Sequence, residues 1–174
     1  MQQHFHDVAI IGAGFGGLCA AIRLRESGVQ SLVILERSGE VGGTWRDNVY
    51  PGCACDVPSH LYSFSFAPNT QWTRPYPQQQ EIQDYILRVT EQYALRPLIR
   101  FNSDVQVLRW LADQACWQVE LPGQEPLLAR HIILATGPLN KPAIPDIPGM
   151  GSFAGGSFHS GHWRHGVDLK GKRI

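Results

Sequence analysis

Short apolar runs alternate with glycine-rich and polar segments in the first part of this 174-residue chain. The run at 7–11 ends in glycines and is typical of a buried strand. Residues 14–27 have helical spacing, and Gly28 is a natural stop. Residues 31–35 form a second apolar run. The order predicts a strand–helix–strand unit within residues 1–36.

The next segment, 38–77, is dense in glycine, proline, asparagine, serine and aromatic residues and has little periodicity. Long irregular segments are unusual in compact domains and are often functional. A helix is predicted at 77–95, with one apolar face formed by Ile82, Tyr85, Ile86, Val89 and Tyr93.

Four further strands are predicted from alternating or apolar runs, at 99–101, 105–110, 117–121 and 127–134. Residues 138–160 are again rich in proline and glycine. The succession of strands and helices predicts an α/β fold with a Rossmann-like sheet.

Composition excludes several functional classes. Fifteen basic and fifteen acidic residues give zero formal charge, which argues against a nucleic-acid binder. No apolar run approaches the roughly 18 residues of a spanning helix, so no membrane association is expected. Four scattered cysteines do not form a disulfide framework, and a reducing cytoplasm is expected.

The strongest local motif matches G-x-G-x-x-G and consists of Gly12, Ala13, Gly14, Phe15, Gly16 and Gly17. It lies between a predicted strand and a predicted helix, the context that dinucleotide binding requires. Gly12 permits a tight turn, Gly14 lets a pyrophosphate approach, and Gly17 allows helix and strand to pack closely. The helix N-terminus then offers free N–H groups to phosphates.

Glu36 ends the second strand about 20 residues beyond the glycines. A carboxylate at this position can accept hydrogen bonds from a ribose diol, which favours a nucleotide without a 2′-phosphate. On these residues alone the nucleotide could be NAD or FAD.

Further stretches resemble a known class of flavoprotein. Residues 41–45 (VGGTW) and 134–137 (LATG) resemble the FAD-binding half of flavoproteins with two dinucleotide-binding domains. Residues 153–163 fit F-x-G-x-x-x-H-x-x-x-W, which resembles the fingerprint of Baeyer–Villiger monooxygenases. Trp163 favours this branch over the N- and S-oxygenating flavin monooxygenases, which usually have Tyr or Phe there. Arg164 departs from the Pro or Asp that usually follows.

The resemblance implies an NADPH- and O₂-dependent enzyme that oxidises small ketones to esters or lactones through a C4a-peroxyflavin. Asp56 matches a catalytic aspartate near the flavin that contacts an arginine. Besides the glycine loop and Glu36, the implied cofactor-binding positions are Arg37, Gly43, Thr44, Trp45, Arg46, Asp47, Ala54, Cys55, Asp56, Tyr62, Val105, Thr136 and Gly137. The stretch 54–56 also meets NADP in the family, Val105 matches a contact near the adenine end, and His159 and Trp163 match linker residues.

The resemblance also implies a domain organisation. It predicts an FAD-binding domain at 1–150 and a linker at 151–174 that leads to a missing NADPH-binding domain. On this interpretation the chain is a fragment, and the isolated chain is expected to be inactive. The alternatives are a non-catalytic FAD-binding remnant or a fragment of an N- or S-oxygenating enzyme.

Other chemistries are weaker interpretations of the same residues. His159, His162 and His165 lack the spacing of a metal site, and the Cys53–Cys55 pair lacks the C-x-x-C spacing of a redox motif. Cys19 is expected to pack in the core. Without a basic patch, a group of aromatic residues is expected to wall a cofactor or substrate cavity rather than to stack on bases: Tyr50, Tyr62, Phe64, Phe66, Trp72 and Tyr76.

Overall fold

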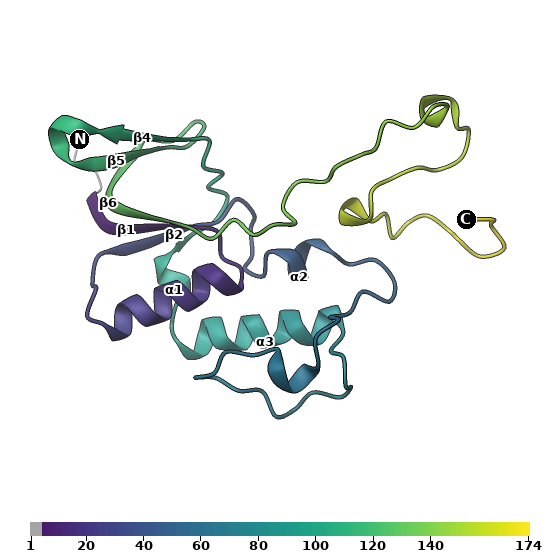
Figure 1. Ribbon diagram of the computed structural model, residues 1–174, viewed down its shortest axis with the longest axis horizontal. Helices are drawn as coiled ribbons and strands as arrows, with labels where there is room; N and C mark the ends of the chain where they lie inside the picture. Colours follow the sequence, from purple (N-terminus) through teal and green to yellow (C-terminus); the bar gives the residue numbers. More distant parts are fainter. Residues whose placement is uncertain (1–4) are drawn as a thin grey trace.

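A six-stranded sheet organises the first three quarters of the chain (Figure 1). The structure is a computed structural model that describes residues 5–174. The strand order is β3-β2-β1-β6-β5-β4. The strands are β1 Phe5–Ile11, β2 Leu32–Leu35, β3 Ile99–Arg100, β4 Val107–Leu111, β5 Cys116–Glu120 and β6 Leu127–Leu134.

Pairing divides the sheet into a parallel half and an antiparallel half. Strand β1 pairs in parallel with β2 and β6, and β2 pairs in parallel with β3. Strands β4, β5 and β6 form antiparallel pairs. After β1 the chain builds outward on one side through β2 and β3, crosses to the opposite edge of the sheet as β4, and returns through β5 to β6 on the other side of β1. Ligands of open α/β sheets bind at such a reversal, outside the carboxyl ends of the strands.

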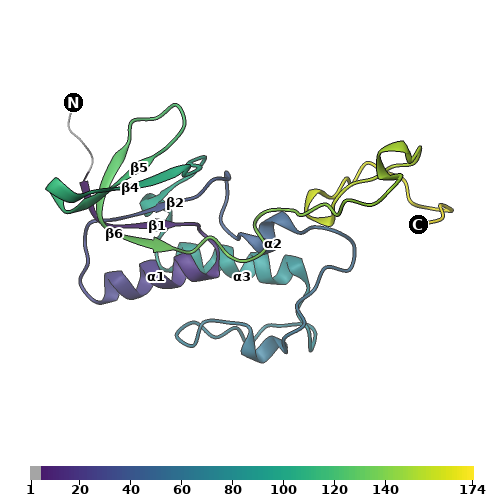
Figure 2. The same cartoon turned by 45° about the horizontal axis from the view of Figure 1, so that its top comes forward.

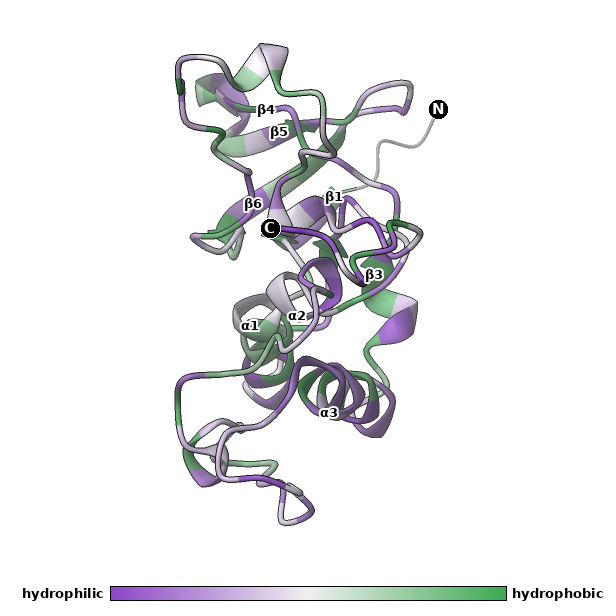
Figure 3. Cartoon of the chain, turned by 90° about the vertical axis from the view of Figure 1, so that its right-hand side faces the viewer, coloured by the Kyte–Doolittle hydropathy of each residue, from purple (hydrophilic) through white to green (hydrophobic). Residues whose placement is uncertain are grey.

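Three α-helices accompany the sheet: α1 Phe15–Glu26, α2 Thr44–Asp47 and α3 Gln79–Gln92. Helices α1 and α3 run side by side under one face of the sheet (Figures 1 and 3). Short 3₁₀ turns occur at Ser59–Leu61, Arg96–Leu98, Ala112–Gln114, Met150–Ser152 and Ser160–His162.

The core has two layers because successive strand residues point to opposite faces. Val8 and Ile10 pack in the larger cluster, with the buried residues of α1 and α3. Ala9 packs in the smaller cluster on the other face, with buried residues of β2, β5 and β6. Strand β2 is buried throughout, as expected for a central parallel strand covered on both faces.

Sequence patterns predicted these elements closely. Every predicted strand is present, and β1 begins at Phe5, two residues earlier than expected. The predicted second helix is present as α3, and four of the five residues of its apolar face are buried: Ile82, Tyr85, Ile86 and Val89. The unpredicted element is α2, a single helical turn inside the irregular segment 38–77. A four-residue helix has too few positions to show a helical period.

Beyond Leu134 the chain leaves the sheet. Residues 135–174, called here the arm, contain only two short 3₁₀ turns. In Figures 1 and 2 the arm extends away from the sheet and helices, and the C-terminus lies in it. Residues 5–134, called here the body, carry all the regular structure.

Candidate dinucleotide-binding site

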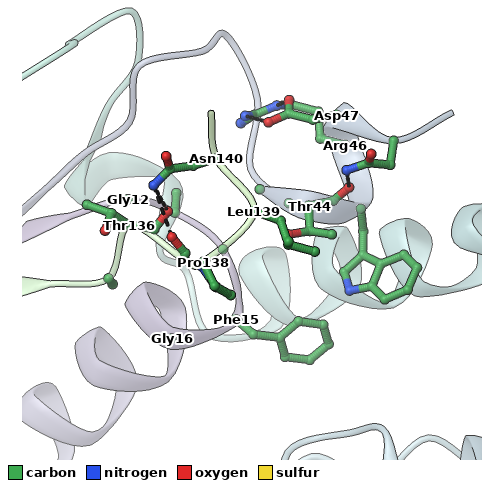
Figure 4. A pocket seen from close by; sticks show the side chains of 18 of the residues that line it. Gly12, Phe15, Gly16, Thr44, Arg46, Asp47, Thr136, Pro138, Leu139 and Asn140 are labelled. Atoms are coloured by element: carbon green, nitrogen blue, oxygen red, sulfur yellow. Dashed lines mark hydrogen bonds and ion pairs between the residues drawn. The ribbon is translucent and has the colours of Figure 1, made fainter. Parts of the chain in front are cut away.

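A cavity of about 1000 Å³ opens at the carboxyl ends of the parallel strands. Ile11, Leu35 and Ala135, at or just beyond the ends of β1, β2 and β6, lie on its wall. The glycine loop, α2 and the start of the arm complete the enclosure (Figure 4). Its position is the one expected for a ligand at a topological switch point.

Each of the three motif glycines lacks a side chain for a different structural reason. Gly12 has a φ of +105°, and an added Cβ would lie 2.6 Å from the carbonyl oxygen of Ala135. A Cβ on Gly17 would lie 1.9 Å from the carbonyl oxygen of Gly12, so helix and strand could not pack as they do. Gly14 has open space around it, and the nearest atom to an added Cβ is Gly43 Cα at 3.8 Å. The fold itself therefore does not require glycine at position 14, and the missing side chain leaves room at the edge of the cavity.

Helix α1 presents its N-terminus to this cavity through Gly14, Phe15 and Gly16. No side chain caps the helix, and no acidic residue lies in its first turn. The first N–H groups of a helix have no partner within the helix. The end of α1 therefore offers donors and a partial positive charge to an anionic ligand.

Glu36 lies at the end of β2 and is 4% exposed. Its Oε2 atom accepts a hydrogen bond from the N–H of Ala13 at 2.8 Å. Its Oε1 atom accepts from the N–H of Ser38 at 3.0 Å and from Arg46 at 2.8 Å. The carboxylate thus connects the glycine loop, the end of β2 and α2.

Arg46 continues this connection. Its guanidinium makes two parallel bonds to Asp47, Nε to Oδ1 at 2.8 Å and Nη2 to Oδ2 at 3.0 Å. Burial alone lowers the pKa of Arg46, but its hydrogen bonds with Asp47 and the charges of Glu36 and Asp47 raise it above its usual range. Asp47 also pairs with Arg37 at 3.3 Å. Charges of alternating sign therefore follow one another along this wall.

A second glycine pair brings α2 against the glycine loop. Gly42 and Gly43 have φ values of +126° and +53°, and the N–H of Gly42 donates to the carbonyl of Ala13 at 3.0 Å. Helix α3 holds this turn with two glutamines one helical turn apart. Gln83 donates to the carbonyl of Val41 at 2.9 Å, and Gln79 donates to the carbonyl of Trp45.

Of the six aromatic residues predicted to wall the cavity, two line it, Tyr62 and Tyr50. Tyr62 lines the cavity, and its hydroxyl accepts from Trp45 Nε1 at 2.9 Å. Burial raises the pKa of Tyr62, and that hydrogen bond works in the opposite direction. Tyr50 also lines the cavity, and its hydrogen bond with Cys53 raises the pKa of Tyr50.

The prediction that six aromatic residues wall the cavity is wrong for the other four. Phe64, Phe66 and Trp72 pack against α1 and α3 instead. Phe64 contacts Phe15 with ring centroids 5.1 Å apart, and Tyr76 is largely exposed. These rings attach the irregular segment to the helices, because a segment without regular structure has only its side chains with which to pack.

The turn after β6 forms the opposite wall. Thr136 and Gly137 line the cavity, and the Asn140 side chain donates to both of their carbonyls at 2.8 and 3.0 Å. Figure 4 shows this clasp above the glycine loop. Arg37 donates to the carbonyl of Asn140 at 3.0 Å, which joins the two walls across the cavity.

The stretch 54–56 lies on the cavity wall as well. Cys55 is buried, and its sulfur accepts from the N–H of Val57 at 3.4 Å. Asp56 is exposed at the cavity. All four cysteines are free, Cys53 and Cys55 are buried, and Cys19 is half-buried against the core.

The cavity brings together nearly all the residues predicted for the cofactor site, from Gly12 to Gly137. Gly17 is the exception, because it lies beneath the loop in the contact between α1 and β1. Several lining residues were not predicted: Asn48, Ser103, Asp104, Pro138, Leu139, Asn140 and Lys141. Asn48, Asp104 and Pro138 each adjoin a predicted residue in the sequence, which is the one signal that could have found them, and the other four do not.

The described residues form neither a metal-binding cluster nor a membrane-spanning helix. Within residues 5–174, no group of three His, Cys, Asp or Glu side chains is arranged to hold a metal ion. No helix in the same range is long and apolar enough to cross a membrane.

Comparisons with known proteins agree with this geometry. Residues 10–77 match the family described as an NAD(P)-binding Rossmann-like domain. A Baeyer–Villiger monooxygenase of Streptomyces coelicolor is 53% identical over 99% of this chain and 33% of its own length. A Baeyer–Villiger monooxygenase of Pseudomonas aeruginosa is 45% identical over 96% of this chain and 32% of its own length.

Solved structures show the same correspondence. The OTEMO complex with FAD and NADP has a TM-score of 0.88 and 34% identity, over 98% of this chain and 34% of that chain. Cyclohexanone monooxygenase bound to ε-caprolactone has a TM-score of 0.89 and 34% identity, with the same coverage.

The fold and the glycine loop thus define a Rossmann-like dinucleotide-binding domain. More narrowly, the chain is similar over nearly its whole length to one part of Baeyer–Villiger monooxygenases. It spans about a third of the length of the curated relatives that it matches.

Proposed function

We propose that this chain binds FAD in the cavity and is the FAD-binding portion of an NADPH- and O₂-dependent monooxygenase that oxidises ketones to esters or lactones. One observation carries the proposal. The glycine loop, Glu36, the Gly42–Gly43 turn and the Thr136–Gly137 turn all open onto the same cavity.

The residues present fit an extended dinucleotide. A cavity of about 1000 Å³ is at the upper end of the usual range for small-molecule sites, about 300–1,000 Å³. Its floor is made of glycine backbone, with the Cα of Gly43 only 3.8 Å from where a Cβ on Gly14 would lie. The uncapped end of α1 suits a pyrophosphate, and Glu36 suits a ribose.

The proposal assigns parts of the cavity to parts of the ligand. Glu36 and Val105 lie at the adenosine end, and Thr44, Tyr62 and Gly137 lie toward the flavin. When bound, FAD supplies the redox chemistry, by accepting hydride from NADPH and activating O₂. The walls hold it in place and limit the access of water.

Asp56 keeps its proposed catalytic role. It is exposed at the cavity wall beside Cys55, so its carboxylate is accessible to a cation from another segment. Its charge contributes, after burial, to the raised pKa of Tyr62. The proposal retains an FAD-binding domain at 1–150 with a linker at 151–174. It also retains a cytoplasmic location, which rests on the four free cysteines.

Flavin binding is tested with Gly14→Val. An added Cβ would meet no atom closer than 3.8 Å, and the branched side chain would occupy the proposed pyrophosphate path. We expect the wild-type chain to retain FAD through gel filtration and Gly14→Val to lose at least about 100-fold in affinity with an unchanged melting temperature. Gly156→Ala, which has nothing within 4 Å of its added Cβ, is the matched control.

Failure of the folded wild-type chain to retain flavin would contradict the assignment of FAD. The reaction class requires a protein that carries this chain together with the remaining length of its relatives. We expect such a protein to consume NADPH in response to a cyclic or aryl ketone and to form an ester or lactone. Oxygenation of amines instead, without ester formation, would assign it to the N-oxygenating enzymes.

A further inference from the structure

Arg46 is enclosed by protein acceptors although it lines the cavity. Its side chain is 16% exposed. Nε and Nη2 bond Asp47, and Nη1 donates both to Glu36 Oε1 at 2.8 Å and to the carbonyl of Glu40 at 2.6 Å. Four of the roughly five N–H groups of a guanidinium are thus engaged. Arg46 has little capacity left for a ligand.

Glu36 shows the complementary arrangement. Its Oε1 accepts two hydrogen bonds, from Arg46 and Ser38, while Oε2 accepts one, from Ala13. An ionised carboxylate has roughly four acceptor positions, two on each oxygen. One position therefore remains, and it belongs to Oε2 of a residue that lines the cavity.

We propose that Arg46 is a positioning residue that fixes the Glu36 carboxylate, so that Oε2 accepts one hydroxyl of the adenosine ribose. This inference rests on the proposed function, because it takes the ligand to be an adenine dinucleotide. Arg46 occupies Oε1 and neutralises the buried charge of Glu36, so the carboxylate keeps one orientation. Without Arg46, Glu36 would be a buried anion held by N–H groups alone, and a carboxylate in that state relaxes toward water.

The remaining members of the network hold Arg46 in turn. Asp47 engages the guanidinium through both oxygens, a geometry that fixes its plane. Arg37 pairs with Asp47 at 3.3 Å and reaches the carbonyl of Asn140. The orientation of Glu36 is thus connected to both walls of the cavity.

The test compares ADP with 2′-deoxy-ADP, which differ by one ribose hydroxyl. Dissociation constants are measured by calorimetry for wild type, Arg46→Gln and Arg46→Lys, and FAD binding by wild type is measured separately. We expect wild type to prefer ADP about tenfold, the effect of one hydrogen bond to a charged group. Arg46→Gln should reduce the preference to about twofold or less, and Arg46→Lys, which keeps the charge, should restore part of it.

The preference for ADP over 2′-deoxy-ADP, rather than the affinity for either nucleotide, distinguishes a positioning role of Arg46 from a general effect on stability. A purely structural role would weaken both nucleotides equally and leave the preference at its wild-type value, which would overturn the inference. An unchanged preference in Arg46→Gln with unchanged affinity would overturn it as well. Arg109→Gln removes an exposed ion pair with Glu120 on the antiparallel half of the sheet, and it should change nothing.

Asp47→Asn provides a second variant if Arg46→Gln does not fold. It weakens the support of Arg46 and should reduce the ADP preference about threefold, and no reduction would count against the inference. A folded wild-type chain that binds neither FAD nor ADP would overturn the proposed function and this inference together. Wild-type binding of FAD without any preference for ADP would overturn the inference alone.

Discussion

The body and the arm differ in where their apolar side chains lie. In the body, large residues such as Ile10 and Ile34 are fully buried between the sheet and the helices. In the arm, Leu139, Ile144 and Phe153 are 71%, 65% and 64% exposed. Figure 3 shows apolar positions concentrated where α1, α3 and the sheet meet.

The difference shows that the two regions are stabilised in different ways. The body buries two clusters of apolar side chains, one on each face of the sheet, and these clusters stabilise its conformation. The arm leaves several large apolar side chains exposed and contributes no residue beyond Ala135 to the two core clusters, so burial of apolar surface stabilises it little. Near the body the arm is held by polar contacts, of which the Arg37–Asn140 bond is one.

The largest expected effect is that of Gly17→Ala. The added Cβ would lie 1.9 Å from a backbone oxygen, so α1 must move away from β1. We expect the free energy of unfolding to fall by at least about 4 kcal/mol, measured by urea denaturation. Gly151→Ala in the arm, where nothing lies within 4 Å, should leave it within about 0.5 kcal/mol. Similar effects of the two substitutions would remove the distinction between the regions.

An intermediate effect is expected from a cavity in the core. Ile34→Ala deletes part of a fully buried side chain of β2 and should cost about 3 kcal/mol of unfolding free energy. Ile144→Ala makes the same chemical change on an exposed residue of the arm and should cost less than about 0.5 kcal/mol. A cost above about 1 kcal/mol for Ile144→Ala would show that the arm packs internally after all.

The smallest effect concerns a helix cap and its pH dependence. Burial alone raises the pKa of Glu81. Its carboxylate, however, accepts hydrogen bonds from the N–H groups of Thr73 at 2.9 Å and Gln78 at 3.3 Å, and these bonds hold that pKa below its usual value. A carboxyl whose folded pKa is lowered stabilises the protein above its unfolded pKa of about 4.3 and loses that contribution as pH falls through the folded value.

Glu81→Gln should therefore lower stability by about 0.5 kcal/mol at neutral pH, since solvent screens this partly exposed group. The difference from wild type should shrink as pH falls below about 4.3 and disappear below the lowered folded pKa of Glu81. The control is Asp168→Asn in the arm, where the carboxylate accepts only from the N–H of Lys170. A difference between Glu81→Gln and wild type that persists in acid would assign the effect to packing instead of charge.

Sequence patterns predicted the elements of the body well because its periodicities are local. Apolar runs such as that of β2 and the one-sided helix α3 can be recognised within a short window. The glycine loop and Glu36 could be placed for the same reason, because strand, turn and helix follow one another directly along the chain.

Patterns failed where the outcome depends on distant partners. Whether Phe64 or Tyr50 faces the cavity depends on how the irregular segment packs against α1 and α3, and composition carries no such information. Asn140 clasps the Thr136–Gly137 turn and meets Arg37, yet no motif marks it.

By itself the sequence determined the α/β class, the order of strands and helices, the glycine loop and the resemblance to Baeyer–Villiger monooxygenases, because each depends on residues close together in the chain. Only the tertiary structure decided that Glu36 uses one oxygen for Arg46 and leaves a position on the other. It also decided that the two walls meet through Arg37 and that the apolar residues of the arm lie exposed. These depend on hydrogen bonds and packing between segments far apart in the chain, which form only when the sheet brings its carboxyl edge together.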